Sequence, residues 1–249
     1  MDLIVRNVRL ANGFPGEPVD IRVAGGKIVA IERSLAATAH THDAGGCLAC
    51  AGLVETHIHL DKSRIIDRCL PERGREISPM QQVAALKKEF TVEDVRSRAE
   101  RTLTECIING TTRMRTQVEV DPAIGLRGFE AVHSLIADYK WAIDIEICVF
   151  PQDGLTNHPG TEELLVEAPK RGAEVIGGAP RYDTDHDGQI RRIFVLAREF
   201  DVDIDMHPRR RQHAGSDGHP SRLPVDRRIP ARRTGRSRPH GEVVDDAAV

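Results

Sequence analysis

The sequence predicts an α/β protein with a parallel sheet, preceded by a small β unit and followed by an irregular tail. Between residues 51 and 207, short apolar strand patterns alternate with helical patterns, and repeated strand–helix units are typical of parallel sheets. Residues 1–50 show only strand and turn patterns. Residues 208–249 contain ten Arg, no Lys and five Pro, with only six Val, Ile, Leu, Met, Phe, Trp, Tyr or Cys, which is too few for a core.

The whole-chain composition is that of a protein large enough to bury a core. The 249 residues are 40% hydrophobic and 29% charged, with a formal net charge of −3. The start, MDLIVRNVRL, lacks the regions of a signal peptide, and no apolar run reaches membrane length. Five scattered Cys fit a reducing compartment. We therefore expect a cytoplasmic protein without a membrane partner.

The first region is expected to be an antiparallel β unit. Residues 2–10 alternate apolar and polar side chains, which predicts a strand. Residues 19–23 and 27–31 flank a Gly-Gly turn signal, and this arrangement predicts a hairpin.

The second region is expected to hold five strands, each followed by a loop or helix. The strands begin near residues 53, 111, 144, 174 and 202. Four helices are predicted at helical spacing: one between the cap Thr91 and the stop Gly110, and others at 129–139, 162–172 and 189–200.

Histidines end the first and fifth of these strands. His57 and His59 lie in GLVETHIHLDK, where a buried strand should meet its first loop. The period of two in a strand puts both on one face, where two imidazoles can bind one divalent metal. His207 ends the fifth strand and would extend this pair of ligands to a three-ligand site. The alternatives are a solvated strand end and a histidine at a loop start.

These segments carry a family resemblance. The run LIVRNVRLANG…DIRVAGGKIVAIE followed by GLVETHIHLDK resembles the amidohydrolase superfamily, and most closely its cytosine-deaminase-like branch. RMRTQVEVD, CVFPQDGL, VIGGAPRYD and DVDIDMH extend the match over residues 1–207. The resemblance implies an incomplete (β/α)8 barrel in residues 51–207, with about five of eight strands. It also implies part of a β-sandwich in residues 1–50 and leaves residues 208–249 as an irregular basic tail.

The resemblance further implies one divalent metal, Zn or Fe. His57, His59 and His207 match three of the family's four metal ligands, and the fourth, an aspartate on the eighth strand, has no counterpart. The fourth strand ends in Gly177-Gly178 where two-metal members carry a carboxylated lysine, which favours one ion. One ion suffices for hydrolytic deamination, because it can lower the pKa of bound water toward ~7.

The expected substrate is a small cyclic amidine of pyrimidine or triazine type. Gln152, in CVFPQDG just past the third strand, is by resemblance the glutamine that orients it. A carboxamide offers a donor and an acceptor to a ring amide, and a solvated loop glutamine is the alternative. Gln117 and Glu119 end the second strand on one face and could line the pocket.

One departure from the family concerns proton transfer. The family has a proton-shuttling glutamate three residues after the fifth-strand histidine, and here Arg210 occupies that place. Arginine cannot act as a base near neutral pH. We therefore assign no certain catalytic residue and expect little or no deaminase activity from this chain. A homo-oligomer is expected for intact family members.

Two other functions stay open. One is hydrolysis of a cyclic amide or amide on the same scaffold. The other is a non-catalytic fragment whose basic tail binds nucleic acid. Ten Arg without interleaved aromatic residues form no recognised nucleic-acid-binding motif, so no nucleic-acid partner is expected.

The tail also predicts a change of reading frame near the codons for His207 and Pro208, after which the composition shifts abruptly to Arg and Pro. With each codon started one base later, degeneracy allows Arg210 to read Glu or Asp. The run ARRTGRSRPHGEVVDD can then read LAGRVAVGHMAKLSTT, which resembles the family's sixth strand. The nucleotide sequence decides the matter: an alternate frame without a long open stretch would contradict the prediction.

Overall fold

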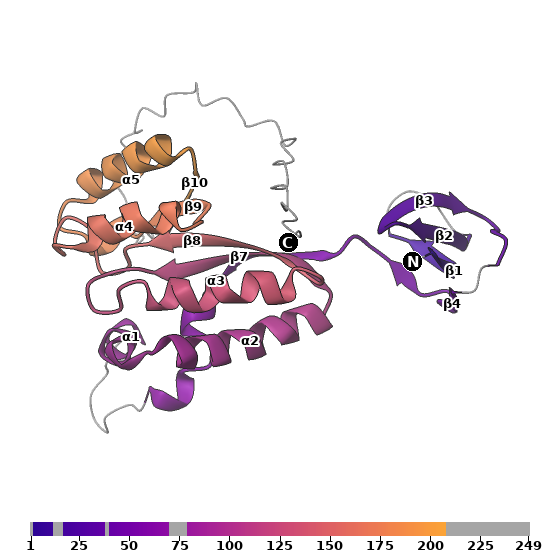
Figure 1. Cartoon of the computed structure of the whole chain (residues 1–249), viewed down its shortest axis with the longest axis horizontal. Helices are drawn as coiled ribbons and strands as arrows, with labels where there is room; N and C mark the ends of the chain where they lie inside the picture. Colours follow the sequence, from indigo (N-terminus) through magenta and orange to yellow (C-terminus); the bar gives the residue numbers. More distant parts are fainter. Residues whose placement is uncertain (1, 12–16, 38–39, 70–78, 208–249) are drawn as a thin grey trace, which may run out of the picture. The chain divides into compact units, whose positions relative to one another are not determined.

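The computed structural model describes residues 2–11, 17–37, 40–69 and 79–207. The predicted tail, Arg210 and the predicted change of frame lie outside these residues. The described residues form two separate sheets, shown in Figure 1, and each is described by itself. The boundaries predicted for the two regions stay predictions.

The first sheet has five strands and is mixed. Its members are β1 (Asp2–Leu10), β2 (Val19–Ala24), β3 (Lys27–Glu32), β4 (Thr41–Asp43) and β5 (Leu48–Ala49). β1, β2 and β3 pair antiparallel, which confirms the predicted hairpin. β4 and β5, which were not predicted, pair parallel to β1 and make the sheet mixed. These two strands are too short to show a sequence period.

The second sheet is parallel, and its strands are ordered β10-β9-β8-β7-β6. The strands are β6 (Leu53–Ile58), β7 (Thr111–Glu119), β8 (Asp144–Phe150), β9 (Val175–Gly178) and β10 (Asp203–Met206). All five begin at or within one residue of the predicted positions. Each strand is added beside the previous one, which is the arrangement of a (β/α) barrel and confirms the predicted fold class for this part of the chain.

Five α-helices accompany the strands in the described residues. They are α1 (Pro79–Leu86), α2 (Val92–Ile108), α3 (Arg127–Tyr139), α4 (Thr161–Lys170) and α5 (His186–Phe200), of which α1 was not predicted. Thr91 caps α2 as expected, since its Oγ1 accepts a hydrogen bond from the backbone N–H of Asp94. Gly110 follows the end of α2 with a positive φ of 91°. None of the described helices has the length and apolar character needed to cross a membrane.

The core lies between the parallel sheet and its helices. Helices α2 and α3 run side by side along the sheet in Figure 1 and contact each other. Each fully buried aliphatic or aromatic side chain contributes roughly 1.5–3 kcal/mol relative to an exposed one. The largest fully buried side chains of this core include Leu60, Leu103, Met114, Phe129, Leu135, Ile147, Leu165, Ile176 and Ile193.

A polar link shows how strongly the parallel sheet is curled. Arg115 on β7 donates to Asp205 on β10 over 3.3 Å, and Gln117 donates to the same carboxylate over 3.2 Å. Three strand spacings separate β7 from β10, which in a flat sheet is about 14 Å. Side chains can bridge that separation only if the sheet curls so that the two strands approach each other across its concave side.

β6 lies at one edge of this sheet and is more exposed than predicted. Among the described strands it pairs only with β7. Leu53 and Val54 keep 53% and 58% of their surface exposed, where a buried strand was expected. An edge strand has one neighbour instead of two, so its side chains lose covering contacts.

Candidate metal centre

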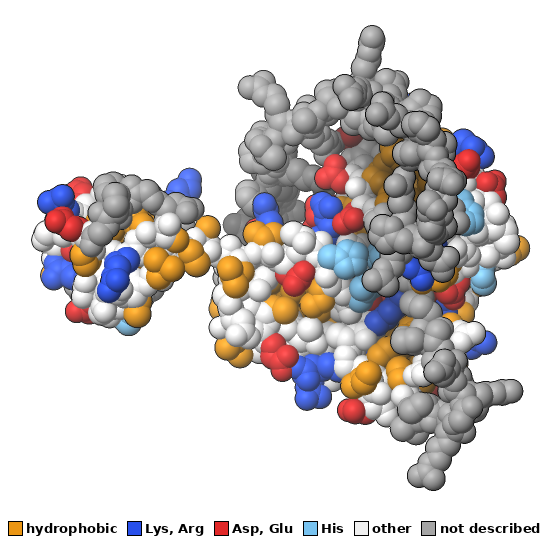
Figure 2. Space-filling model, turned by 180° about the vertical axis from the view of Figure 1, so that it is seen from behind, with side chains coloured by type: hydrophobic (Ala, Val, Ile, Leu, Met, Phe, Trp, Pro, Cys, Tyr) orange, Lys and Arg blue, Asp and Glu red, His pale blue; other side chains and the backbone are white. Residues whose placement is uncertain are grey.

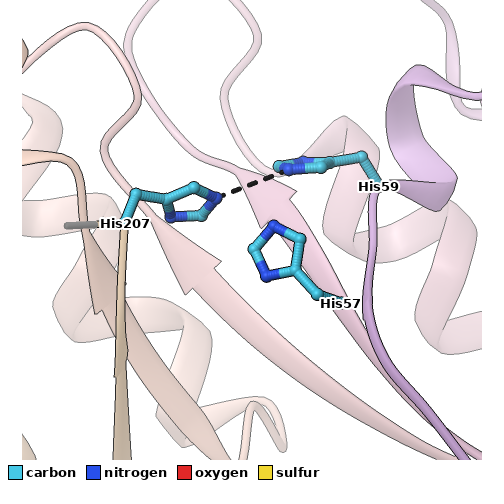
Figure 3. Close-up of side chains that lie close together, drawn as sticks. All are labelled: His57, His59 and His207. Atoms are coloured by element: carbon cyan, nitrogen blue, oxygen red, sulfur yellow. Dashed lines mark hydrogen bonds between the residues drawn. The ribbon is translucent and has the colours of Figure 1, made fainter. Parts of the chain in front are cut away.

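Three histidines meet at the carboxyl end of the parallel sheet (Figure 3). His57 lies on β6, His59 directly follows β6, and His207 directly follows β10. β6 and β10 are the two edge strands, about 19 Å apart if the sheet were flat. Because the sheet curls, one ring nitrogen from each histidine lies within 4.8 Å of one from each of the other two. Histidine side chains reach the surface of this part of the chain in Figure 2, and His57 is exposed.

The turn after β6 is held in place by buried contacts. Leu60 is fully buried, and its backbone N–H donates to the Thr116 hydroxyl of β7 over 3.1 Å. The fully buried carboxylate of Asp61 accepts from the backbone N–H of Glu119 over 3.0 Å. Burial raises the pKa of Asp61. These contacts fix the backbone on the C-terminal side of His59.

His207 is fixed by β9. Its backbone N–H donates to the carbonyl of Gly178 over 2.8 Å, which continues the pairing of β10 with β9 past Met206. A Cβ on Gly177 would lie 2.4 Å from the carbonyl oxygen of Asp205. No side chain therefore fits at Gly177, and the end of β9 stays free of the bridging lysine that the sequence also lacks.

Phe150, at the end of β8, forms one wall of the histidine group. Its ring stacks on His207 with centroids 4.5 Å apart and meets His59 edge-on at 5.5 Å. No local signal marks Phe150 for this role, because an apolar residue at the end of a buried strand is usual in any core.

The surroundings keep two of the rings neutral. Burial, helped by Lys62 and the neighbouring histidines, lowers the pKa of His59 to about 3. Burial and His57 lower the pKa of His207 to about 4. Both rings are therefore uncharged at pH 7, which is the state that binds metals. The Nδ1 atoms of both rings are buried without a hydrogen-bond partner in the described part of the chain.

The geometry of these donors fits one divalent ion. The Nε2 atoms of His59 and His207 face each other at 3.5 Å, as the dashed line in Figure 3 marks. Two nitrogens bound at 2.0–2.1 Å to one tetrahedral ion lie about 3.3 Å apart. The ring of His57 completes the group, with its centroid 4.9 Å from that of His207. The three predicted ligands are therefore brought together in an arrangement that a single ion can accept.

The predicted substrate residues lie near this group in different settings. Gln152 follows β8 and is only 7% exposed, two residues after Phe150. Gln117 is fully buried and bonded to Asp205. Glu119 is 1% exposed and bonded to lysines, with Lys62 at 2.6 Å. The roles predicted for Gln152, Gln117 and Glu119 stay predictions.

A second group of possible ligands was missed at the sequence level. Carboxylate oxygens of Glu119, Asp121 and Asp153 lie within 4.8 Å of one another. The ammonium of Lys87 contacts all three. Lys87 stands beside a second lysine in the sequence LKKEF, and nothing local marks it as buried.

Comparison with known proteins supports the resemblance. No protein-family model matches the chain. The chain is 30% identical over 216 residues to N-isopropylammelide isopropyl amidohydrolase of Pseudomonas sp. (strain ADP), a match covering 83% of this chain and 53% of that protein. The fold of the present chain matches that of the 5-methylcytosine deaminase of Klebsiella pneumoniae with a TM-score of 0.73 and 29% identity, over 82% of this chain and 51% of that one.

A second solved structure gives the same result. The N-isopropylammelide isopropylaminohydrolase of Burkholderia multivorans matches with a TM-score of 0.71 and 28% identity, over 84% of this chain and 54% of that one. The chain thus spans about half the length of the relatives it matches. Sequence, strand order and the shared fold agree that the chain belongs to the cytosine-deaminase-like branch of the amidohydrolase superfamily.

Proposed function

We propose that this chain carries part of the site of a metal-dependent deaminase that acts on a small cyclic amidine of pyrimidine or triazine type. The observation that carries the proposal is the convergence of His57, His59 and His207 at the carboxyl end of the parallel strands. The names of the relatives, a 5-methylcytosine deaminase and two N-isopropylammelide hydrolases, support this substrate class.

One divalent ion, Zn or Fe, is proposed as the cofactor, and the three histidines would hold it. When bound, such an ion supplies an activated water for attack on the amidine carbon. The neutral rings of His59 and His207 suit this task, because a protonated imidazole has no lone pair to donate.

The other residues of this site would bind and orient the substrate. Gln152 is proposed to meet the ring amide, for which its carboxamide provides both a donor and an acceptor. Phe150 covers His59 and His207 from one side and shields them from water there. In the low-dielectric setting that results, polar contacts with the substrate are stronger than in water.

Proton transfer is the step for which this chain is least equipped. Arg210 stands where the family has its glutamate, and an arginine cannot take a proton near neutral pH. Losing a general acid–base group typically removes about 10²–10⁴-fold in rate. We therefore propose metal binding with little or no deamination by this chain, and a homo-oligomer without a nucleic-acid partner for the intact enzyme.

The test uses the full 249-residue chain after removal of metals with a chelator. Titration with Zn²⁺ in a calorimeter is expected to give one ion per chain, and cytosine is expected to release ammonia slowly or not at all. Absence of specific Zn²⁺ binding would contradict the proposed site. Ammonia release at a rate typical of intact enzymes would contradict the expected loss of proton transfer.

A further inference from the structure

A buried ammonium stands among three carboxylates beside the histidine group. Lys87 begins a short 3-10 helix (Lys87–Glu89) before α2 and is only 3% exposed. Its Nζ donates to Glu119 over 2.5 Å and also contacts Asp121 and Asp153. Glu119 and Asp121 are 1% and 2% exposed. Charges buried this deeply persist only when they are closely paired, because leaving water is costly.

Lys87 stays charged in this position. Burial alone would lower the pKa of its ammonium, but the charge of Glu119 and the hydrogen bonds to Asp121 and Asp153 outweigh burial and raise that pKa. The cation fills the space between the three carboxylates and, together with Lys62 bound to Glu119, supplies two positive charges to this acidic group from within the chain. No external metal is needed there.

The three carboxylates that contact Lys87 lie in three different parts of the fold. Glu119 ends β7, Asp121 lies in the loop between β7 and α3, and Asp153 lies in the loop between β8 and α4. One side chain therefore ties the segment before α2 to the carboxyl ends of two neighbouring strands. Loops at these ends carry the binding residues of barrel enzymes.

Two short routes lead from Lys87 to the histidine group. Along the first, Glu119 bonds Lys62 at 2.6 Å, and the ammonium of Lys62 lies 5.3 Å from the centre of the Phe150 ring. That ring stacks on His207. Along the second, Asp153 is the residue next to Gln152, so its bond to Lys87 restrains the backbone that carries Gln152.

We propose that Lys87 is a positioning residue that holds Lys62, Phe150 and Gln152 in place against the three-histidine group. It acts through Glu119 and Asp153 and does not itself touch the histidines. The proposal rests on the proposed function for the meaning of the histidine group, although the contacts it describes exist without a metal or a substrate.

The first test is hydrogen exchange on the metal-free full chain carrying Lys87→Met. Methionine keeps the length of the lysine stem and removes the charge. We expect roughly tenfold faster exchange in residues 119–125 and 151–157, with no change in β1, β2 and β3. Lys170→Met is the matched control, since Lys170 is 56% exposed and lies 4.0 Å from Glu167. Unchanged exchange in both loops of the Lys87 variant would overturn the proposal.

The second test separates positioning from simple loss of stability. The ring resonances of His59 and His207 in the metal-free chain report the placement of the Phe150 ring, because stacked rings shift each other's signals. Lys87→Met is expected to move these resonances and Lys170→Met is not. If the loops loosen while both ring signals stay in place, Lys87 is only structural and the proposal is overturned.

A milder variant covers the case in which Lys87→Met does not fold. Asp153 keeps 28% of its side chain exposed, so Asp153→Asn removes one contact with less damage. Compared with the wild type, this variant is expected to show faster exchange in residues 151–157 and unchanged exchange in residues 119–125. If exchange in residues 151–157 is also the same as in the wild type, the result counts against the proposal. Co²⁺ binding by the wild type is measured separately, and its absence would count against the proposed function alone.

Discussion

Two groups at the carboxyl end of the parallel sheet have the same spacing and opposite chemistry. In the first group one ring nitrogen each of His57, His59 and His207 lies within 4.8 Å of the other two. In the second group one carboxylate oxygen each of Glu119, Asp121 and Asp153 lies equally close to the other two, and the ammonium of Lys87 contacts all three residues. The acidic group has its counter-charge inside the chain. In the histidine group the rings of His59 and His207 are neutral, and one buried nitrogen of each has no partner in the described residues.

The comparison teaches that spacing alone does not define a metal site. Buried polar atoms are normally satisfied, so atoms that stay unsatisfied call for an explanation. In the acidic group, hydrogen bonds and charge are already provided. In the histidine group the Nδ1 atoms of His59 and His207 have no partner in the described residues, and the Nε2 atoms of the same two rings face each other at a spacing that fits one ion.

Removing one histidine should abolish tight metal binding. Even the outer partners of metal ligands are worth about 10–100-fold in affinity, so His59→Gln should weaken Zn²⁺ binding by more than about 100-fold. His133→Gln is the matched control, because His133 lies exposed on α3. The measurement is Zn²⁺ titration of the metal-free full chain. Equal affinity of the His59 variant and the control would remove the difference between the two groups.

A satisfied buried carboxylate should matter for stability without any metal. Asp183 is 4% exposed and accepts hydrogen bonds from the backbone N–H groups of Leu155 and Thr156 and from Gln189. Burial alone would raise the pKa of Asp183, but these bonds outweigh it and lower that pKa to about 2. Asp183→Asn should therefore reduce the free energy of unfolding by about 2 kcal/mol at pH 7.

The pH dependence of Asp183 has a definite sign. A carboxyl group with a lowered pKa stabilises the fold above its ordinary pKa, and this contribution is lost as pH falls from about 4 to about 2. Urea unfolding at several pH values measures it. The control is Asp138→Asn, since Asp138 keeps 55% of its side chain exposed. An Asp183 variant with wild-type stability at pH 7 would show that these bonds contribute nothing.

The histidine group should weaken the fold in mild acid. The pKa values of His59 and His207 are lowered in the folded state, so the unfolded chain binds more protons as pH falls below about 6.5. After allowance for partial solvent exposure, each ring should cost about 1 kcal/mol between pH 6.5 and pH 5. Urea unfolding of the metal-free chain measures the slope. The double variant His59→Gln, His207→Gln should flatten it, and an unchanged slope would assign the effect to other groups.

The smallest effect is expected at an ion pair in solvent. Arg171 is exposed and bonds Glu167 at 2.9 Å and Glu130 at 3.1 Å. Water screens such pairs, and ordering the long side chains offsets the attraction. Arg171→Ala should leave the midpoint of thermal unfolding within measurement error. A clear fall in that midpoint would mean that exposed pairs behave like the buried group of Lys87.

The sequence revealed the parallel strands because their signals are local. Each strand combines an apolar run with a nearby turn or cap, and the three histidines lie at strand ends or directly after them. Lys87 could not be found in this way. Its partners lie 32, 34 and 66 residues further along the chain. The pairing of β7 with β8 brings these carboxylates together, and no local pattern around Lys87 encodes that pairing.

The short strands β4 and β5 were missed for a different reason. They are three and two residues long, so neither can complete the alternation that marks a strand. Their pairing with β1 depends on a neighbour some forty residues earlier in the chain. The shortness of these strands and their distance in sequence from β1, rather than unusual chemistry, are why they were not predicted.

The link between Arg115 and Asp205 also has a consequence for the timing of folding. The two residues are 90 positions apart, and β8 and β9 lie between their strands in the sheet. On a ribosome, Arg115 emerges long before its partner has been synthesised. Contacts of such long sequence separation form late, because a large loop must close first. The hydrogen bond between these side chains therefore forms only after the last described strand, β10, has joined the sheet.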